Sequence, residues 1–115
     1  MTDIVVRGWG SYEVLLDDCG VKVKRITLSP NKRMSLQLHR ERDELWLVIS
    51  GAAFAQVGNE TKAIETGDIL VVPRLEVHRL TNESDSDMVM IEIQTGDCWE
   101  NDIIRIEDDY GRGIF

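Results

Sequence analysis

Residues 31–51 read NKRMSLQLHRERDELWLVISG, and this stretch decides the fold and the chemistry expected of the chain. Gln37 and His39 lie two positions apart, so on a strand both side chains point to the same face. A short turn then brings Glu44 to the start of the next strand, facing the same interior, and Gly51 marks where that strand ends. The pattern therefore predicts an amide, an imidazole and a carboxylate that converge on one point.

A second stretch, residues 67–82 with the sequence GDILVVPRLEVHRLTN, contributes His78 from a distant strand. The chain has only two histidines, and both fall within these two motifs. The predicted ligand set is Gln37, His39, Glu44 and His78. Such a mixed nitrogen and oxygen shell suits a divalent first-row metal and leaves positions for water or substrate. Zinc is the first choice, while iron, manganese, nickel and cobalt stay open. Glu41 is a weaker ligand candidate, with a loop charge as the alternative.

Short β-like runs separated by turn residues dominate the rest of the sequence, and no segment keeps a helical stripe for three turns. Closely spaced antiparallel strands favour a closed or double-sheet structure, which covers strand edges. We therefore expect an all-β jelly roll in one domain spanning residues 1–115, with the tail from Asn101 to Phe115 packed on the barrel. The predicted strands are Ser11–Leu16, Val21–Ser29, Met34–His39, Glu44–Ser50, Ala52–Val57, Thr61–Ile64, Ile69–Val72, Val77–Thr81 and Met88–Gln94.

Composition narrows the class of partner. A formal charge of −8 opposes attraction to nucleic-acid phosphates and to anionic membranes, so neither is an expected partner. No apolar run approaches the roughly 20 residues that cross a bilayer, and residues 1–10 do not resemble a secretory signal, so we expect a cytoplasmic protein. Cys19 and Cys98 lie outside zinc-like spacing and are predicted to be buried thiols, with one disulfide as the alternative.

Several segments resemble the small cupin domain of type II phosphomannose isomerases, in consistent order from Arg7 to Arg112. The segments that carry the likeness are RGWGSY at 7–12, VKVKRI at 21–26, SLQLH at 35–39, ELW at 44–46, DIIR at 102–105 and EDDYGR at 107–112. Gln37 sharpens the likeness, because this family typically surrounds its metal with Gln, two His and Glu. The chain departs from the family in having Glu41 and Leu45 where histidines are usual, and Asn31 and Leu75 where glycines are usual.

The resemblance implies interconversion of mannose 6-phosphate and fructose 6-phosphate through an enediol. That reaction needs a group to move a proton and a cation to hold the phosphate of the small-molecule sugar phosphate. Lys24, Arg42 and Arg112 are the candidates, with surface charge or salt-bridge roles as the alternative. Because Glu41 and Leu45 could line the pocket, two other classes stay open: a noncatalytic sugar-binding or regulatory cupin that acts with a separate nucleotidyltransferase, and a different metal-dependent cupin enzyme.

Self-association is the remaining expectation. Small cupins often pair, which indicates a homodimer formed through edge strands or exchanged N-terminal segments. Trp9, Tyr12 and Trp46 are interpreted as core or dimer-contact residues and not as platforms for the sugar. Leu75 is expected to be tolerated if its turn does not require a positive φ.

Overall fold

The computed structural model describes residues 3–112, which are built from strands and contain no helix within that range. The strands are β1 (Ile4–Arg7), β2 (Gly10–Asp18), β3 (Val21–Leu28), β4 (Lys32–Arg33), β5 (Leu36–Leu38), β6 (Arg42–Ser50), β7 (Ala52–Val57), β8 (Glu60–Glu65), β9 (Ile69–Val72), β10 (His78–Asn82), β11 (Met88–Gly96) and β12 (Ile104–Glu107). No helix in the described part is long and apolar enough to span a membrane.

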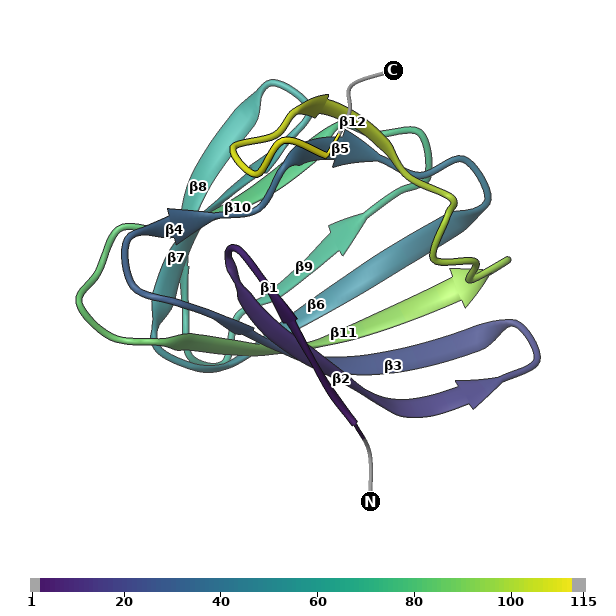
Figure 1. The fold of residues 1–115 in the computed structure, drawn as a ribbon, viewed down its shortest axis with the longest axis horizontal. Coiled ribbons are helices and arrows are strands. Elements are labelled where there is room, and N and C mark those ends of the chain that lie inside the picture. Colours follow the sequence, from purple (N-terminus) through teal and green to yellow (C-terminus); the bar gives the residue numbers. More distant parts are fainter. Residues whose placement is uncertain (1–2, 113–115) are drawn as a thin grey trace.

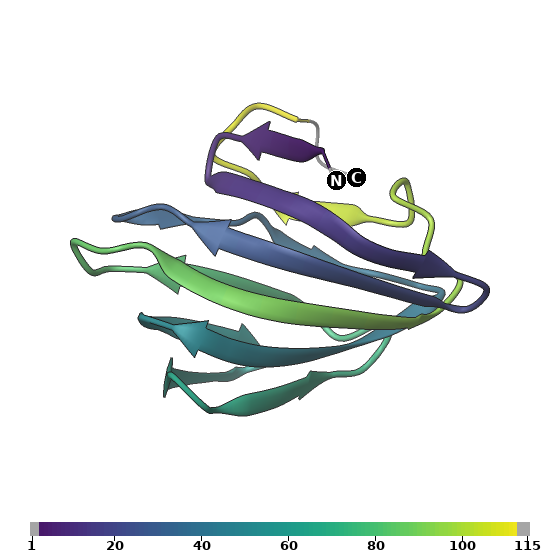
Figure 2. The same ribbon diagram turned by 90° about the horizontal axis from the view of Figure 1, so that it is seen from below.

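Two antiparallel sheets face each other across the interior (Figure 1). The first has the strand order β1-β2-β3-β11-β6-β9, and Figure 2 shows it from outside. The second has the order β12-β5-β10-β7-β8, and β4 pairs with β10 beside it. This arrangement is the double-stranded β-helix, or cupin jelly roll, and it confirms the predicted all-β fold.

The inward-facing side of the first sheet changes from charged at one end to apolar at the other. Strand register aligns Lys24 with Glu92, and Ile26 with Met90. Charged residues therefore lie beside charged residues on neighbouring strands, and apolar residues beside apolar ones. The apolar half joins the buried core with Trp46 and Leu80. Inward residues, from the polar to the apolar end, are Lys22, Lys24, Ile26 and Leu28 in β3; Arg42, Glu44, Trp46 and Val48 in β6; and Gln94, Glu92, Met90 and Met88 in β11. One half of the interior is therefore a core and the other half lines a pocket.

Most predicted strands match observed ones to within two residues at each end, with one exception. The predicted run Met34–His39 is longer than the strand observed there, because β5 covers only Leu36–Leu38 and His39 lies just beyond it. The two-residue strand β4 was not predicted. Neither were the edge strands β1 and β12. Each lies at one edge of its sheet and has a single partner, so neither shows the strong alternation of the central strands.

The C-terminal tail packs on the barrel as predicted, over the part of it that the structure describes. Strand β12 pairs with β5, Tyr110 packs directly against Gly8, and the Tyr110 hydroxyl donates a hydrogen bond to the Arg33 carbonyl at 2.7 Å. Residues 113–115 of the predicted tail lie outside the described range.

The turn at Leu75 requires a positive φ. Leu75 was expected to be tolerated only if its turn did not, so that condition is not met. Its φ is 70°, and Asn31, at the other position where glycine is usual in the family, has a φ of 56°. The backbone amide of Leu75 donates to the carbonyl of His39 at 2.7 Å, which ties this turn to the metal motif. Left-handed backbone costs a leucine about 1–2 kcal/mol, whereas asparagine tolerates it better.

The cysteine prediction was wrong for Cys19. Both thiols are free, so the structure contains no Cys19–Cys98 disulfide, and Cys19 is exposed where β2 turns into β3. Cys98 is half-buried, and burial raises the pKa of its thiol. Cys19 follows Asp17 and Asp18 in a polar turn, so no apolar environment is available to bury it.

Candidate metal centre and pocket

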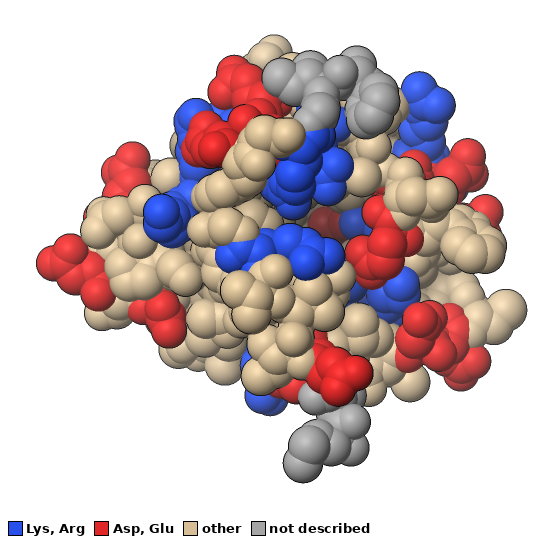
Figure 3. All heavy atoms as spheres, in the orientation of Figure 1, with Lys and Arg blue, Asp and Glu red and all other residues tan. Residues whose placement is uncertain are grey.

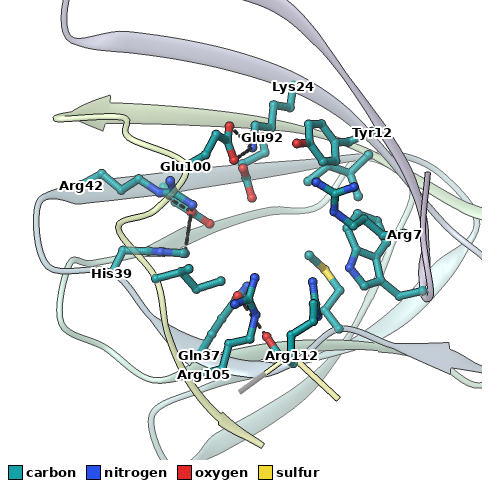
Figure 4. Close-up of a pocket in the computed structure, with 16 residues that line it drawn as sticks. Arg7, Tyr12, Lys24, Gln37, His39, Arg42, Glu92, Glu100, Arg105 and Arg112 are labelled. Atoms are coloured by element: carbon teal, nitrogen blue, oxygen red, sulfur yellow. Dashed lines mark hydrogen bonds and ion pairs between the residues drawn. The ribbon is translucent and has the colours of Figure 1, made fainter. Parts of the chain in front are cut away.

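The polar half of the interior opens into a cavity of about 250 Å³. In Figure 3 basic side chains border a hollow near the middle of the face toward the viewer, and Figure 4 shows the residues that line the cavity. The lining residues are Arg7, Trp9, Tyr12, Lys24, Ile26, Met34, Ser35, Gln37, His39, Arg42, Glu44, Glu92, Glu100, Ile103, Arg105 and Arg112.

Three buried side chains at this end come close enough to hold one metal ion. His39 follows β5, Glu44 lies in β6 and His78 begins β10, and a ligand atom from each lies within 4.8 Å of the others. Nε2 of His39 is 3.1 Å from one Glu44 carboxylate oxygen, and Nε2 of His78 is 3.9 Å from the other. Two atoms that each bind one zinc ion at about 2.0–2.2 Å lie roughly 3–3.5 Å apart. The His39–Glu44 spacing matches that range, and the His78–Glu44 spacing is wider.

Backbone carbonyls hold both imidazoles in the orientation that a metal requires. Nδ1 of His39 is 2.7 Å from the Asp102 carbonyl oxygen, and Nδ1 of His78 is 2.9 Å from that of Glu76. A carbonyl only accepts, so both rings carry their proton on Nδ1 and direct the Nε2 lone pair into the site. Nε2 of His78 is buried and has no hydrogen-bond partner among the described residues. A buried nitrogen without a partner is costly, and a cation at this point would satisfy it.

The charges at the cluster suit a cation as well. Burial lowers the pKa of His78 and keeps its ring neutral. Burial alone would raise the pKa of Glu44, but its contacts with His39, His78 and Arg42 hold that pKa well below its ordinary value. A neutral His78 ring beside an ionised Glu44 carboxylate is the form in which these two groups bind a divalent metal.

Gln37, the fourth predicted ligand, lies directly opposite His78 in the β5–β10 pair, so the two side chains share a face. Gln37 is buried, and its amide oxygen accepts a hydrogen bond from the Ser35 hydroxyl at 3.1 Å. That oxygen keeps a second lone pair. Glu41, the weaker ligand candidate, is exposed and lies outside the cluster.

Arg42 is buried and contacts the cluster itself. Its Nε donates to Glu44 at 3.0 Å, Nη1 donates to the Trp99 carbonyl at 3.2 Å, and Nη2 lies 3.1 Å from Nε2 of His39. The second oxygen of Glu44 accepts from the Trp46 indole at 3.0 Å. Arg42 therefore orients the Glu44 carboxylate. It also balances the negative charge of that carboxylate, as a bound metal would.

Positive charge collects around the rest of the cavity. Lys24 is buried, forms an ion pair with Glu100 at 2.8 Å, and lies 4.4 Å from the Tyr12 ring centroid. Arg112 is held by Asp108 through two hydrogen bonds, at 2.9 and 3.1 Å.

Arg105 also lines the cavity, and its Nε is buried without a hydrogen-bond partner among residues 3–112. Burial, followed by repulsion from Arg112 and Arg7, lowers the pKa of Arg105. Figure 4 shows these three arginines pointing toward one another across the opening. Sequence reasoning missed Arg7 and Arg105. The signal for Arg105 was its alternation with Ile104 and Ile106 in the tail.

Glu92 is a further pocket residue that sequence reasoning missed. It is buried in β11 between Lys24 and Trp46 on the neighbouring strands. Burial, with repulsion from Glu44 as the next cause, raises the pKa of Glu92 to about 8. Its place in the inward alternation with Met88 and Met90 was a visible signal, because a carboxylate there must face the interior.

The residues that line the cavity differ from those expected from the sequence. Glu41 is exposed, and Leu45 lies on the outer face of β6, so neither lines the cavity and their departure from the family pattern does not alter it. Trp9 and Tyr12 do line the cavity, although they were not assigned to it. Trp9 and Trp46 are buried within the chain, which leaves them unavailable for a dimer contact.

The family of this chain follows from its matches. The model for the mannose-6-phosphate isomerase C-terminal family matches residues 1–108. The chain belongs to this family. Its relatives include the alginate biosynthesis protein AlgA of Pseudomonas aeruginosa, 39% identical over 109 residues, and the mannose-1-phosphate guanylyltransferase ManC of Salmonella typhimurium, 34% identical over 109 residues. In both cases the match covers 94% of this chain and 23% of the relative.

Solved structures agree on the fold of this family member. The capsular polysaccharide assembling protein CapF of Staphylococcus aureus superposes with a TM-score of 0.78 at 21% identity, covering 93% of this chain and 32% of that one. A double-stranded β-helix protein of Klebsiella pneumoniae gives a TM-score of 0.75 at 22% identity, covering 87% and 89%. At such identity the likeness shows the cupin fold alone.

Proposed function

We propose that the protein is a metal-dependent sugar-phosphate isomerase that interconverts mannose 6-phosphate and fructose 6-phosphate. The observation that carries the proposal is that the His39, Glu44 and His78 cluster and an arginine-rich rim open into the same small cavity. A sugar phosphate has a carbonyl end and a dianionic end, and this cavity offers complementary groups for both. The family match, which spans nearly the whole chain, supports the same substrate class.

The arginines at the rim would bind the phosphate. Arg105 has a buried nitrogen with no partner, and its neighbours Arg7 and Arg112 raise the local positive charge. A guanidinium binds phosphate through a two-pronged hydrogen-bonded contact, and a phosphate here would relieve the repulsion among three cations. The sugar would then extend from the rim toward the histidine cluster.

The cluster would hold the metal through His39, Glu44 and His78, with Gln37 as a fourth ligand. Zinc is the first choice, because two imidazoles and a carboxylate form a set that zinc commonly binds. When bound, such an ion supplies polarisation of the sugar carbonyl and favours the enediol form. The Asp102 and Glu76 carbonyls keep both rings oriented, and Arg42 keeps the Glu44 carboxylate in place.

We assign the proton transfer between the two carbons to Glu92. One carboxylate can take a proton from one carbon and return it to the next, and a raised pKa makes its ionised form a stronger base. Lys24 lies opposite Glu92 in the strand pair, and Coulombic attraction by this cation lowers the pKa of Glu92. Lys24 would thereby help Glu92 to ionise.

A coupled assay tests the proposal. Protein purified with zinc should release fructose 6-phosphate from mannose 6-phosphate, and Glu92→Gln protein prepared in parallel should not, which excludes a contaminating host isomerase. Absence of conversion by the parent protein, while a known isomerase works in the same mixture, would refute the assignment.

A second candidate is a noncatalytic sugar-phosphate-binding module that works with a separate nucleotidyltransferase. The observation behind it is that this chain spans about a quarter of the length of its relatives, one of which is described as a guanylyltransferase. Calorimetry separates the two functions. Saturable binding of mannose 6-phosphate that is weakened by Arg105→Gln, with no isomerisation, would favour the binding module.

A further inference from the structure

Two buried lysines share one carboxylate at the edge of the pocket. Lys22 and Lys24 lie two positions apart on β3, and both side chains face the interior. Nζ of Lys24 is 2.8 Å from one oxygen of Glu100, and Nζ of Lys22 is 3.2 Å from the same oxygen. The second Glu100 oxygen accepts a hydrogen bond from Lys24 at 3.1 Å. The carboxylate therefore lies between two ammonium groups, in the position that an anionic ligand would take.

The exposure of these three side chains is uneven. Only 9% of the Lys22 side chain and 7% of the Lys24 side chain is accessible, whereas that of Glu100 is 50% exposed. Lysines are rarely buried without a paired charge, and the other carboxylate near Lys22, that of Asp17, is 3.8 Å away. Burial alone would raise the pKa of Glu100, but the hydrogen bond and charge of Lys24, followed by those of Lys22, lower it. Glu100 is therefore ionised and closes the lysine pair from the solvent side.

Backbone contacts fix the segment that carries Glu100. The Cys98 carbonyl accepts a hydrogen bond from Nζ of Lys22 at 2.8 Å, and the Trp99 carbonyl accepts one from Arg42 at 3.2 Å. Both anchors are buried side chains of the first sheet. Because the two residues before Glu100 are held in this way, its carboxylate has little freedom to leave the lysines. We interpret Glu100 as a permanent part of the pocket wall.

The cavity therefore has two cationic ends that differ in how their charge is balanced. Lys24 and Glu100 line the same cavity as Arg105 and Arg112, and Figure 4 shows the first two on one side and the two arginines on the opposite side. At the lysine end, Glu100 supplies the negative charge. At the arginine end, Nε of Arg105 is buried and has no hydrogen-bond partner among residues 3–112. An anionic ligand group thus finds an open site at the arginine end and an occupied one at the lysine end.

We propose that Glu100 is a specificity-determining residue, whose carboxylate occupies an anion subsite at Lys22 and Lys24 and excludes ligands with a second anionic group. This inference rests on the proposed function, because the first phosphate is assigned to the arginine end. A hexose 6-phosphate would turn its uncharged end toward Glu100, where the carboxylate accepts hydrogen bonds from sugar hydroxyls. The second phosphate of a hexose 1,6-bisphosphate would meet the negative charge of Glu100 and be repelled.

Isothermal titration calorimetry with two probes, mannose 6-phosphate and mannose 1,6-bisphosphate, tests the proposal. The parent should bind the monophosphate more tightly. Glu100→Ala vacates the subsite, so it should bind the bisphosphate about 10–100-fold more tightly than the parent does, because the second phosphate gains charge-assisted hydrogen bonds from two lysines. Affinity for the monophosphate should change far less. Glu100→Gln removes the charge and keeps the size of the side chain, so it should shift the preference in the same direction by a smaller factor.

Two further variants separate the subsite from a general effect of charge. Asp17→Asn removes a carboxylate that also approaches Lys22 but does not line the cavity, so it should leave both affinities near those of the parent. Glu100→Ala/Lys24→Gln should lose the gain in bisphosphate affinity, because one of the two cations is then absent. Circular dichroism checks the fold of each variant, and the preference of the parent requires no variant at all.

Several results would overturn the proposal. They are a parent that binds the bisphosphate at least as tightly as the monophosphate, no gain in Glu100→Ala and Glu100→Gln, an equal gain in Asp17→Asn, a gain that survives loss of Lys24, and no saturable binding of either probe. Turnover of mannose 6-phosphate is measured separately. An inactive parent with the expected selectivity would refute the isomerase and support the role of Glu100, whereas an active parent without that selectivity would refute only the role of Glu100.

Discussion

The buried Nε2 of His78 makes the metal site testable through stability alone. Replacing His78 by leucine keeps the side chain similar in volume and removes the unpaired nitrogen, whose burial costs about 1–3 kcal/mol. The same change loses the hydrogen bond to the Glu76 carbonyl, which contributes about 1 kcal/mol. In the presence of a chelator the two effects oppose each other. The free energy of unfolding of His78→Leu should therefore lie within about 2 kcal/mol of the parent's value, on the more stable side.

Zinc should reverse that order. At a free concentration 100 times its dissociation constant, a ligand of the folded state stabilises it by about 2.7 kcal/mol, which at roughly 4 °C per kcal/mol raises the melting temperature by about 10 °C. If loss of His78 weakens binding a hundredfold, the same zinc concentration adds only about 0.4 kcal/mol to the variant.

Differential scanning fluorimetry of both proteins, each with chelator and with zinc, measures the crossover. The reasoning fails if the parent melts at one temperature under both conditions. It also fails if His78→Leu keeps the whole zinc-dependent gain, because another set of ligands would then hold the ion.

Three further predictions follow from the pocket and its supports. Glu92→Gln should lower kcat about 10²–10⁴-fold while keeping the zinc-dependent rise in melting temperature; a loss of less than tenfold would remove Glu92 from proton transfer. Arg105→Gln should raise KM for mannose 6-phosphate about 10–100-fold, because a hydrogen bond to a charged group contributes about 1.5–3 kcal/mol. The exposed control Arg40→Gln should leave KM unchanged. Equal KM values for the parent and Arg105→Gln would place the phosphate elsewhere. Leu75→Gly should raise the free energy of unfolding, measured by urea titration, by about 1 kcal/mol. Glycine adopts a φ of 70° without the penalty of roughly 1–2 kcal/mol that leucine carries. Leu75→Ala keeps a Cβ and should give no such gain.

The acid stability of the tail provides one pH-dependent prediction. The two hydrogen bonds from Arg112 are the main cause that lowers the pKa of Asp108 from 3.8 to about 2. A lowered pKa stabilises the folded state above the unfolded value, so this contribution is complete above about pH 4 and is lost as the pH falls toward 2. Asp108→Asn should flatten the stability profile over that window; an unchanged slope would contradict the role of the pair.

Much of the fold could be predicted from the sequence because the central strands alternate clearly. In β3, β6 and β11 the inward positions change from charged to apolar, and the same alternation marks both the core and the pocket. The edge strands β1 and β12 escaped prediction because only one side of each is paired and neither has a strong inner face. The later start of β5 escaped prediction because Met34 and Ser35 already show the alternation of apolar and polar residues that continues through Leu36–Leu38.

The cluster was predictable for a different reason: spacing on strands determines which side chains share a face, and both histidines fell on the inner one. Arg7 and Arg105 were missed because their convergence depends on how the two ends of the chain meet, which no local pattern records. Glu92 was missed because carboxylates are rarely buried, although its alternation with Met88 and Met90 places it on the inward face. The metal identity and the cytoplasmic location stay predictions.

Completion of the pocket depends on the tail. The Asp102 carbonyl orients His39, and the Asp102 carboxylate accepts hydrogen bonds from the backbone amides of Arg40 and Glu41. Arg105 and Arg112 follow on the same segment. A barrel that has closed before residues 102–112 dock would have its hydrophobic interior but a loosely held histidine and a rim short of two cations. Loosening of this segment after folding could therefore switch off ligand binding while the rest of the domain stays intact.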